Sequence, residues 1–233
     1  MIDKRPSRVA GMFDAIAARY DLLNHLLSAG LDRGWRRRAI RSLGLRGGET
    51  VVDACTGTAD LAIAAAAGGA GRVVGVDFAG EMLRLGAAKL KPGARVALAR
   101  ADATCLPVRS GAADAATVAF GIRNVEQPER ALAEMFRVLR PGGQVAILEF
   151  SIPPSPVVRA LYLPYFRHVL PRVGRLVSGH GSAYTYLPAS VGAFIPPLEM
   201  EASLQRCGFE GVARSSLTLG VVTLYTARKP AAR

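Results

Sequence analysis

The sequence predicts an α/β protein built on a mostly parallel sheet with helices on both faces. From about residue 50 onward, strand-like and helix-like segments alternate along the chain, which is typical of parallel βαβ units. Near the C-terminus, two strand-like segments are joined by only Thr218, Leu219 and Gly220. So short a link favours an antiparallel pair at one edge of the sheet.

The elements of the first half are predicted from local patterns. Short Val- and Ala-rich runs bounded by turn residues favour strands. Lys91-Pro92-Gly93 stops the helix that ends at Leu90, because proline and glycine interrupt helices. In order, we expect a strand at residues 50–53, a helix at 60–67, a strand at 72–77, a helix from about 82 to 90, and strands at 95–100 and 115–120.

The second half continues the alternation and then departs from it. Leu132, Met135, Phe136 and Leu139 fall on one face of a helix at residues 128–139, so that face should pack on the sheet. Pro141-Gly142-Gly143 should end the helix. A strand at 145–150 then precedes a Pro- and aromatic-rich stretch, a helix at about 198–207, and strands at 212–217 and 221–227.

Length and composition favour one domain, since 233 residues with 50% hydrophobic content can bury one sizeable core. The longest apolar run, residues 61–67, is far shorter than the roughly 20 residues of a membrane span. We expect an N-terminal helical cap at 1–48, a cofactor-binding core at 49–151, a lid or substrate insertion at 152–196, and a C-terminal helix with strands at 197–233.

Charge and cysteine content narrow the class of partner. The formal net charge of +12 favours phosphate-bearing partners, either nucleic acid or anionic lipid. Three widely spaced cysteines indicate neither a disulfide framework nor a zinc site, and no metal is expected. The N-terminus lacks the apolar segment of a secretory signal, so we expect a cytoplasmic protein.

Acidic residues end three successive predicted strands. Ligands of open α/β sheets bind at this edge. Asp53 opens a loop of small residues that includes Gly57, and such a loop lets backbone approach a ligand closely. Its carboxylates suit a cationic, amino-acid-like ligand better than a diphosphate. Asp77 could accept hydrogen bonds from ribose hydroxyls, and Asp102 with the Ala103 amide could face an adenine. Alternatively, each Asp could simply cap a helix or a turn.

Longer motifs give a more specific indication. The first lies near the N-terminus and consists of Met12-Phe13-Asp14, the segment from Tyr20 to Asn24, and Trp35. The second is Phe-Gly-Ile-Arg-Asn-Val at residues 120–125. The third runs from residues 137–143 to Glu149-Phe150-Ser151. In these residues the chain resembles the class I S-adenosylmethionine-dependent methyltransferases with a seven-stranded, Rossmann-like sheet whose last strand is antiparallel. Within that class it resembles the menaquinone and ubiquinone C-methyltransferases, in particular demethylmenaquinone methyltransferases.

The resemblance implies S-adenosylmethionine as the cofactor, with Gly57, Thr58, Asp77, Asp102 and Ala103 as its binding residues. Asp53, chosen above, and Ala119 complete the expected cofactor site. Four positions depart from the family pattern. Cys55 and Ala59 stand where glycine is usual, Ala119 stands where a cofactor-contacting serine is common, and Asp32 replaces a histidine.

The reaction implied is C-methylation of a prenylated quinol, with demethylmenaquinol as the first choice and a methoxy-polyprenyl-benzoquinol as the alternative. Such a carbon becomes nucleophilic once a phenolic proton leaves. Arg123 and Asn124 are the candidate catalytic residues, because they follow the fourth strand and could stabilise the phenolate. Arginine is a poor base, so water or another group would take the proton, with His25, His168 and His180 as weaker candidates.

Two segments suggest contact with a membrane surface. Leu31, Trp35, Ala39 and Leu43 fall on one helical face, and the opposite face is basic (Arg33, Arg37 and Arg41, with Arg36 and Arg38 adding charge). Such a helix could dock on anionic lipid at the inner face of the membrane, or simply pack on the domain with its charges solvated. An apolar stripe with helical spacing could form a lid over the substrate or part of the core (Val158, Leu161, Tyr162, Tyr165 and Val169).

Two other functions stay open. An RNA methyltransferase would explain the charge and use Cys105 as a nucleophile, although that cysteine precedes the fourth strand and no RNA-binding module is evident; we therefore expect no nucleic-acid partner. A non-catalytic lipid-binding protein could keep the same fold. Homo-oligomerisation is a further open expectation.

Overall fold

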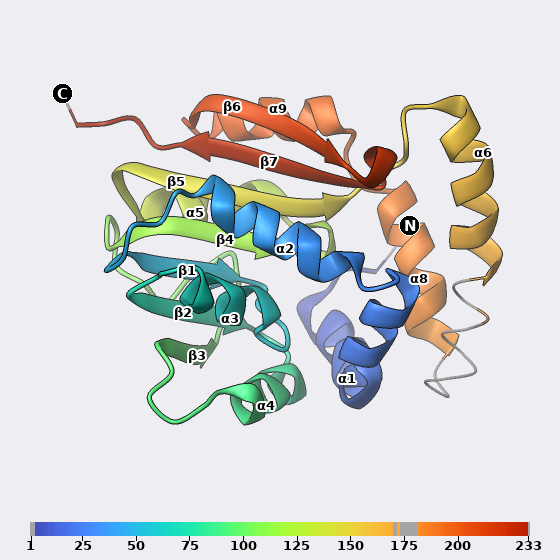
Figure 1. The fold of residues 1–233 in the computed structure, drawn as a ribbon, viewed down its shortest axis with the longest axis horizontal. Coiled ribbons are helices and arrows are strands. Elements are labelled where there is room, and N and C mark those ends of the chain that lie inside the picture. Colours follow the sequence, from blue (N-terminus) through green and yellow to red (C-terminus); the bar gives the residue numbers. More distant parts are fainter. Residues whose placement is uncertain (1–2, 170–171, 173–180, 233) are drawn as a thin grey trace.

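The computed structural model describes residues 3–169, 172 and 181–232. Their central feature is a seven-stranded sheet with the strand order β3-β2-β1-β4-β5-β7-β6 (Figure 1). The elements are α1 (Pro6–Leu27), α2 (Leu31–Ser42), β1 (Thr50–Ala54), α3 (Asp60–Ala67), β2 (Arg72–Asp77), α4 (Gly80–Lys89), β3 (Val96–Arg100), β4 (Ala113–Ala119), η1 (Ile122–Asn124), α5 (Pro128–Val138), β5 (Leu139–Phe150), α6 (Pro156–Pro164), η2 (Tyr165–Val169), α8 (Gly181–Gly192), α9 (Pro197–Arg206), β6 (Glu210–Leu217), η3 (Thr218–Gly220) and β7 (Val222–Arg228).

The strand directions confirm the predicted mixed sheet. The strands β1 to β5 pair in parallel, whereas β7 runs antiparallel to both β5 and β6. The last strand of the chain therefore lies between β5 and β6, and β6 forms the edge. Strand order reverses between β1 and β4, where open α/β sheets bind ligands beyond the carboxyl ends of their strands.

Helices cover both faces of the sheet, as predicted. On one face, residues of α2 and α3 pack in a cluster with β1, β2, β4, β5 and β7. On the other face, residues of α5 and α9 pack with the same sheet. Valine and alanine dominate the buried positions of β1 and β4, because a parallel strand covered on both faces has no solvent-facing side.

The predicted boundary between α5 and β5 was wrong by several residues. We expected the strand to begin at residue 145, but β5 begins at Leu139, which pairs with Ala113. Leu139 has extended backbone directly after the helix, and the register between β4 and β5 then shifts around the turn at Gly142, whose φ is +77°. The turn at Gly142 therefore interrupts the pairing of β4 with β5, and it does not precede β5 as a linker.

The basic helix α2 belongs to the core layer. Trp35, Ala39 and Leu43 are buried as expected, but Leu31 is 47% exposed. The prediction that Arg36 adds charge to the outer face was wrong. Arg36 is buried, with Nη1 in an ion pair with Asp32 and Nη2 at 3.6 Å from Asp60, because its position one turn after Asp32 turns it inward.

The helices α1, α6 and α8 gather beyond the carboxyl ends of the strands, at the right of the sheet in Figure 1. Ile16 and Leu23 of α1 pack with Phe166 of η2 and Val191 of α8. The helix α1 also contacts α4. Within the described residues, no helix is both long and apolar enough to cross a bilayer. These helices therefore form a cover over the edge of the sheet where the acidic residues end their strands.

Candidate active site

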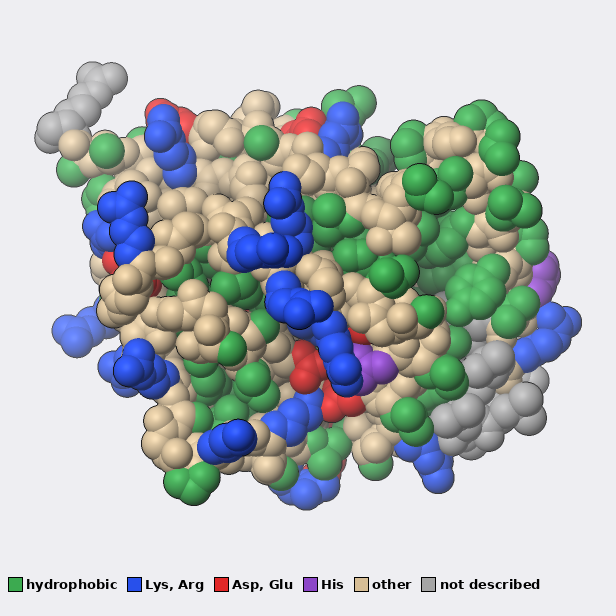
Figure 2. Space-filling model, in the orientation of Figure 1, with side chains coloured by type: hydrophobic (Ala, Val, Ile, Leu, Met, Phe, Trp, Pro, Cys, Tyr) green, Lys and Arg blue, Asp and Glu red, His purple; other side chains and the backbone are tan. Residues whose placement is uncertain are grey.

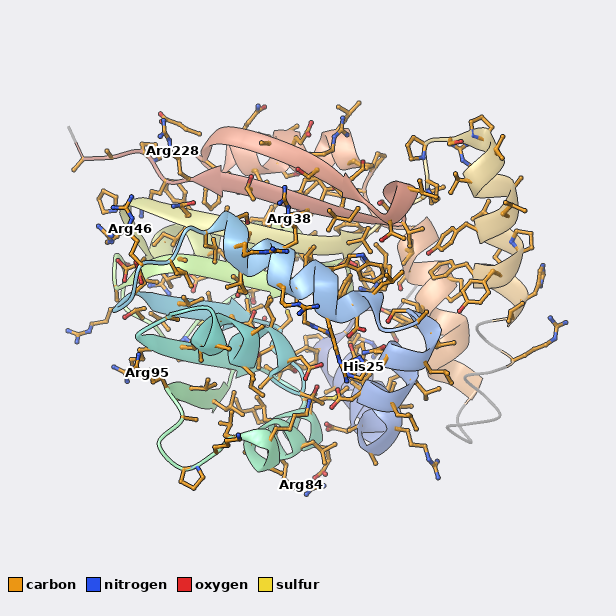
Figure 3. The ribbon with its side chains drawn as sticks, in the orientation of Figure 1. His25, Arg38, Arg46, Arg84, Arg95 and Arg228 are labelled. Atoms are coloured by element: carbon orange, nitrogen blue, oxygen red, sulfur yellow. The ribbon has the colours of Figure 1, made fainter. Side chains whose placement is uncertain are left out.

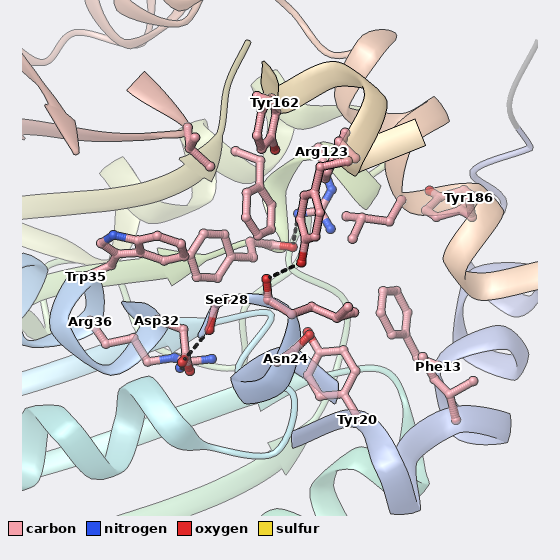
Figure 4. A pocket seen from close by; sticks show the side chains of 18 of the residues that line it. Phe13, Tyr20, Asn24, Ser28, Asp32, Trp35, Arg36, Arg123, Tyr162 and Tyr186 are labelled. Atoms are coloured by element: carbon pink, nitrogen blue, oxygen red, sulfur yellow. Dashed lines mark hydrogen bonds and ion pairs between the residues drawn. The ribbon is translucent and has the colours of Figure 1, made fainter. Parts of the chain in front are cut away.

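Adjoining cavities lie at the carboxyl edge of the sheet. The polar groove consists of two spaces of about 460 and 420 Å³ that share Phe78, Asn124 and Val125. The aromatic pocket encloses about 900 Å³, part of it open to solvent, between α1, α2, α6 and α8 (Figure 4). Phe13, Tyr20 and Phe120 line both the groove and the pocket. A ligand in the groove would therefore meet a ligand in the pocket at this boundary.

Asp77 is held rigidly in the groove by backbone amides. Its Oδ2 accepts a hydrogen bond from the Gly57 N–H over 2.8 Å, and its Oδ1 accepts one from the Ala79 N–H over 2.9 Å. Burial raises the pKa of this carboxyl above its usual value, although the two N–H donors oppose the shift. Gly57 has a φ of +55°, a conformation that glycine adopts without strain.

Asp102, Ala103 and Asn124 line the other part of the groove. Asp102 Oδ1 accepts hydrogen bonds from the backbone N–H and the hydroxyl of Thr104, both over 2.8 Å, so part of its capacity serves a local turn. Asn124 is buried, and its Oδ1 has no hydrogen-bond partner among the described residues. Buried polar atoms are usually paired, so this oxygen points to a ligand.

Two predicted cofactor residues lie behind the groove rather than in it. Asp53 accepts hydrogen bonds from the hydroxyls of Thr56 and Thr117 over 2.6 and 2.7 Å, and burial raises the pKa of its carboxyl to about 6. The Thr58 hydroxyl donates to Asp21 of α1 over 2.6 Å. Asp53 braces β1 against β4, and Thr58 ties the loop after β1 to α1.

The departures from the family pattern at Cys55 and Ala59 fall on strained backbone. Cys55 has a φ of +51° and Ala59 a φ of +66°, a region that residues with a Cβ occupy at a cost. Both side chains are small, and Cys55 lines the groove beside Gly57 and Ala119. The family resemblance implies glycine at both positions, and the positive φ angles show why glycine would suit them.

Arg123 lies at the wall of the aromatic pocket. Its Nη1 donates to Glu149 Oε1 over 2.7 Å and to the Phe120 carbonyl, and its Nε donates to Ser190 Oγ over 3.3 Å. Its guanidinium also lies 5.4 Å from the centre of the Phe150 ring. Among the described residues, Nη2 has no hydrogen-bond partner.

Several tyrosines of the aromatic pocket were not given a chemical role by the sequence analysis. From the sequence, Tyr20 was recognised only as part of a family motif, and Tyr162 only as part of an apolar stripe. Tyr186 was missed. All three line the pocket, and Figure 4 shows Tyr162 and Tyr186 on either side of Arg123. Helical spacing indicated that Tyr162 faces inward, but nothing local in the sequence indicates what a tyrosine hydroxyl meets.

An ion-pair network joins α1 and α2 to the core. Asp32 Oδ2 lies 2.8 Å from His25 Nδ1 and pairs with Arg36, while Lys89 of α4 pairs with Asp21 and Asp60 at 2.5 and 2.7 Å. Burial alone would raise the pKa of Asp32, but the contacts with His25, Ser28 and Arg36 lower it. Basic side chains thus neutralise these carboxylates. His25 serves this network, His168 is exposed on η2, and His180 lies outside the described residues.

The motifs around this site match a known family over nearly the whole chain, since the profile of the ubiE/COQ5 methyltransferase family covers residues 1–229. The chain belongs to the ubiE/COQ5 methyltransferase family. It is 49% identical over 227 residues to the "Ubiquinone/menaquinone biosynthesis C-methyltransferase UbiE" of Syntrophotalea carbinolica, covering 96% of this chain and 95% of that protein. It is 44% identical over 221 residues to the "Demethylmenaquinone methyltransferase" of Thermus thermophilus, covering 94% of this chain and 100% of that protein.

Comparison with solved structures places this ubiE/COQ5 family member in the same fold as the [4+2]-cyclase SpnF, with a TM-score of 0.72 at 17% identity and 97% coverage of both chains. That neighbour is described as a cyclase. A likeness at this identity shows the fold alone, since one fold hosts many reactions. The site residues, rather than the sheet, must therefore carry the functional argument for the ubiE/COQ5 chain.

Proposed function

We propose that this protein transfers a methyl group from S-adenosylmethionine to a ring carbon of a prenylated quinol, with demethylmenaquinol as the acceptor and menaquinol as the product. The observation that carries the proposal is the junction of a polar groove with an aromatic pocket, beside Arg123, whose Nη2 has no hydrogen-bond partner among the described residues. The groove suits a polar nucleoside and the pocket suits an apolar ring. The names of the relatives give the same acceptor class.

The groove fits S-adenosylmethionine in its own residues. The Asp77 carboxylate would accept hydrogen bonds from the ribose hydroxyls, and Asp102 with the Ala103 N–H would hold the adenine. The small residues Cys55, Gly57 and Ala119 line the groove. The Oδ1 of Asn124, which has no partner among the residues that the structure describes, could accept a hydrogen bond from the ligand. When bound, the cofactor supplies an electrophilic methyl group on a sulfonium.

Arg123 would stabilise the charge that develops on the quinol. Removing one phenolic proton places negative charge on the oxygen and on the ring carbon ortho to it. That ortho carbon would take the methyl group from the sulfonium, leaving S-adenosylhomocysteine, and would then lose its own hydrogen as a second proton so that the ring is aromatic again. Arg123 Nη2, which has no partner within the described part of the chain, can donate to that oxygen, with Asn124 beside it on η1. Water or another group accepts the proton, because a guanidinium stays protonated.

The acceptor is tested by incubating the purified protein with methyl-labelled S-adenosylmethionine and either a reduced demethylnaphthoquinone or a reduced methoxy-benzoquinone with a short prenyl chain. Label on the naphthoquinol ring carbon supports the proposal. Label on the benzoquinol alone favours the alternative acceptor. Binding of the cofactor without label on either ring would indicate a non-catalytic protein.

The RNA methyltransferase hypothesis has little support in the structure. Cys105, its proposed nucleophile, is an exposed residue that lines neither the groove nor the aromatic pocket. Basic side chains labelled in Figure 3, such as Arg46, Arg84, Arg95 and Arg228, point outward from different sides of the molecule. The charge therefore does not converge on the candidate site.

We further propose a peripheral contact with anionic membrane at the inner face of the cytoplasmic bilayer. Arg33, Arg37, Arg38 and Arg41 are exposed on α2, and Figure 2 shows basic side chains over this helix and hydrophobic ones over α6. Val157 and Leu161 of α6 are more than two-thirds exposed. Exposed apolar patches beside basic residues suit a lipid surface.

Sedimentation with vesicles tests this contact. The protein should bind vesicles containing anionic lipid more strongly than neutral ones, and Leu161→Asp should weaken the binding. Leu198→Asp is the matched control, since Leu198 is similarly exposed but lies on α9. Equal binding by both variants would contradict a role for α6. Homo-oligomerisation stays a prediction that sedimentation velocity can check.

A further inference from the structure

We infer that the prenyl tail of the quinol leaves the aromatic pocket between the end of α1 and the segment formed by α6 and η2, over an apolar rim that covers the tail where it emerges. This inference rests on the proposed function and adds to it a binding site for the hydrocarbon chain. It assigns a role to exposed leucines that the methyl transfer itself leaves unused.

Tyr165 marks the place where the aromatic pocket reaches the surface. It belongs to η2, which directly follows α6. Tyr165 is 37% exposed, whereas the other described residues that line this pocket are buried or half-buried. A ligand that fills the pocket therefore meets solvent beside Tyr165.

The last turn of α1 forms the other side of this opening. The Tyr165 hydroxyl donates a hydrogen bond to the Leu27 carbonyl over 3.0 Å, and Leu27 and Ser28 also line the pocket. Carbonyls in the last turn of a helix have no partner within the helix, so this bond ties η2 to the end of α1. The mouth of the pocket therefore lies between these two elements.

The mouth lies away from the polar groove. Neither Leu27 nor Tyr165 lines the groove. The boundary between groove and pocket is formed instead by Phe13, Tyr20 and Phe120. With the cofactor in the groove, a tail has no free path across that boundary. A ring whose reacting carbon faces the groove can therefore extend its tail toward the mouth.

The rim of the mouth is apolar on both sides. Leu26 and Leu31 are exposed at the end of α1 and the start of α2, and Leu161 and Val169 are exposed on α6 and η2. Figure 2 shows hydrophobic side chains on both sides of a hollow between α2 and α6. No residue of α6 is fully buried, so the apolar side chains of this helix contribute little to the core.

A hydrocarbon chain is the ligand that suits such a rim. When the tail lies against these leucines, apolar surface of both is removed from water, which favours binding. Contiguous exposed apolar patches commonly mark a binding site. The rim also adjoins the exposed face of α6 that we propose contacts lipid, so a tail that emerges here passes into the bilayer without crossing water.

The test compares a tailed and a tailless acceptor in buffer without vesicles. The double variant Leu26→Ser, Leu161→Ser is assayed with a naphthoquinol that carries a short prenyl tail and with the same ring without a tail. Its kcat/KM for the tailed acceptor should fall about 3- to 10-fold, because apolar contacts are lost. The tailless acceptor should change less than about twofold. If the wild type does not methylate the tailless ring, its inhibition constant is compared instead.

Leu198→Ser is the matched control, because Leu198 is similarly exposed but lies on α9; it should leave both acceptors unchanged. Thermal unfolding of each variant verifies folding. Equal effects of the double variant on the tailed and tailless acceptors would overturn the inference while leaving the methyl transfer intact. A wild-type protein that methylates no quinol would instead contradict the proposed function itself.

Photolabelling locates the tail directly. A naphthoquinol whose tail carries a diazirine is irradiated with the wild-type protein and S-adenosylhomocysteine, and the labelled peptides are identified by mass spectrometry. The label should lie at residues 26–31 or 161–169, and an excess of the tailed quinol without the diazirine should suppress it. Suppressible label found only on other elements of the pocket, such as α8, would show that the tail leaves by another route.

Discussion

Arg123 and Glu149 form a buried ion pair, with Nη1 of the arginine 2.7 Å from Oε1 of the carboxylate and both side chains at most 6% exposed. Glu149 also accepts a hydrogen bond from the Arg123 backbone N–H over 3.3 Å. Because the carboxylate holds Nη1 of the guanidinium, it also fixes the position of Nη2, for which the described residues supply no partner. The pair therefore orients the group that we propose stabilises the phenolate.

Arg123→Ala should lower kcat by about 100- to 1000-fold, because the developing charge loses its donor. It should also lower the free energy of unfolding by about 3–5 kcal/mol, since Glu149 is left buried without its partner. Steady-state kinetics and urea unfolding measure the two effects. The double variant Arg123→Met, Glu149→Leu removes both charges and so distinguishes the effect on catalysis from the effect on stability. It should be more stable than Arg123→Ala and equally inactive. Near-normal kcat in either folded variant would refute the assigned role.

Asp77→Ala should weaken binding of S-adenosylmethionine by about 10- to 100-fold, because charge-assisted hydrogen bonds to the ribose are lost. Its effect on kcat at saturating cofactor should be small, since Asp77 lies away from the reacting ring. Calorimetric titration gives the dissociation constant. Asp53→Asn serves as the control, because Asp53 lies behind the groove, and its cofactor affinity should stay close to that of the wild type. Unchanged affinity in Asp77→Ala would remove this carboxylate from the site.

Asp53 should make stability depend on pH. Its pKa in the folded protein is about 6, above the ordinary value of 3.8, so the folded state holds the proton more tightly than the unfolded state. Ionisation of Asp53 therefore lowers the stability of the folded state. This loss is absent at pH values below the pKa of Asp53 in the unfolded state, and it is complete at pH values above its pKa in the folded state. For a shift of this size, linkage predicts a loss of about 3 kcal/mol as pH rises from roughly 4 to 7.

Asp53→Asn removes this titration. The difference in the free energy of unfolding between variant and wild type should therefore move in favour of the variant by about 2–3 kcal/mol between pH 4 and 7. It should be flat above pH 7. Urea unfolding at a series of pH values provides the measurement. A difference that stays constant across this range would show that Asp53 has the same pKa in both states.

Gly121→Ala should destabilise the protein by about 1–3 kcal/mol through overpacking. A Cβ at Gly121 would lie 2.3 Å from the Cβ of Cys55, too close for either side chain. Cys55→Gly removes the opposing atom and suits the φ of +51° at that position. In a double-mutant cycle, Cys55→Gly should recover most of the loss, with a coupling of more than about 1 kcal/mol. Additive effects would show that the clash is relieved elsewhere.

The local pattern predicted most of the fold because the elements here are short and clearly bounded. The bounds of α3 and β2 agree with the prediction, and the link at Thr218–Gly220 joins an antiparallel pair as expected. The prediction failed at Leu139, where backbone that leaves a helix pairs at once with β4. Periodicity alone cannot reveal such a pairing, because its partner lies 26 residues earlier at Ala113.

The sequence by itself determined the order of strands and helices, the acidic residues at the strand ends and the motifs of the ubiE/COQ5 family, because these depend on residues close together in the chain. Only the tertiary structure decided that Asp77 faces the groove while Asp53 turns away, that Arg36 is buried with Asp32 and Asp60, and that Tyr162 and Tyr186 share the pocket wall with Arg123. The physical reason is that spacing sets the face on which a side chain lies. What that side chain meets depends on how distant elements pack.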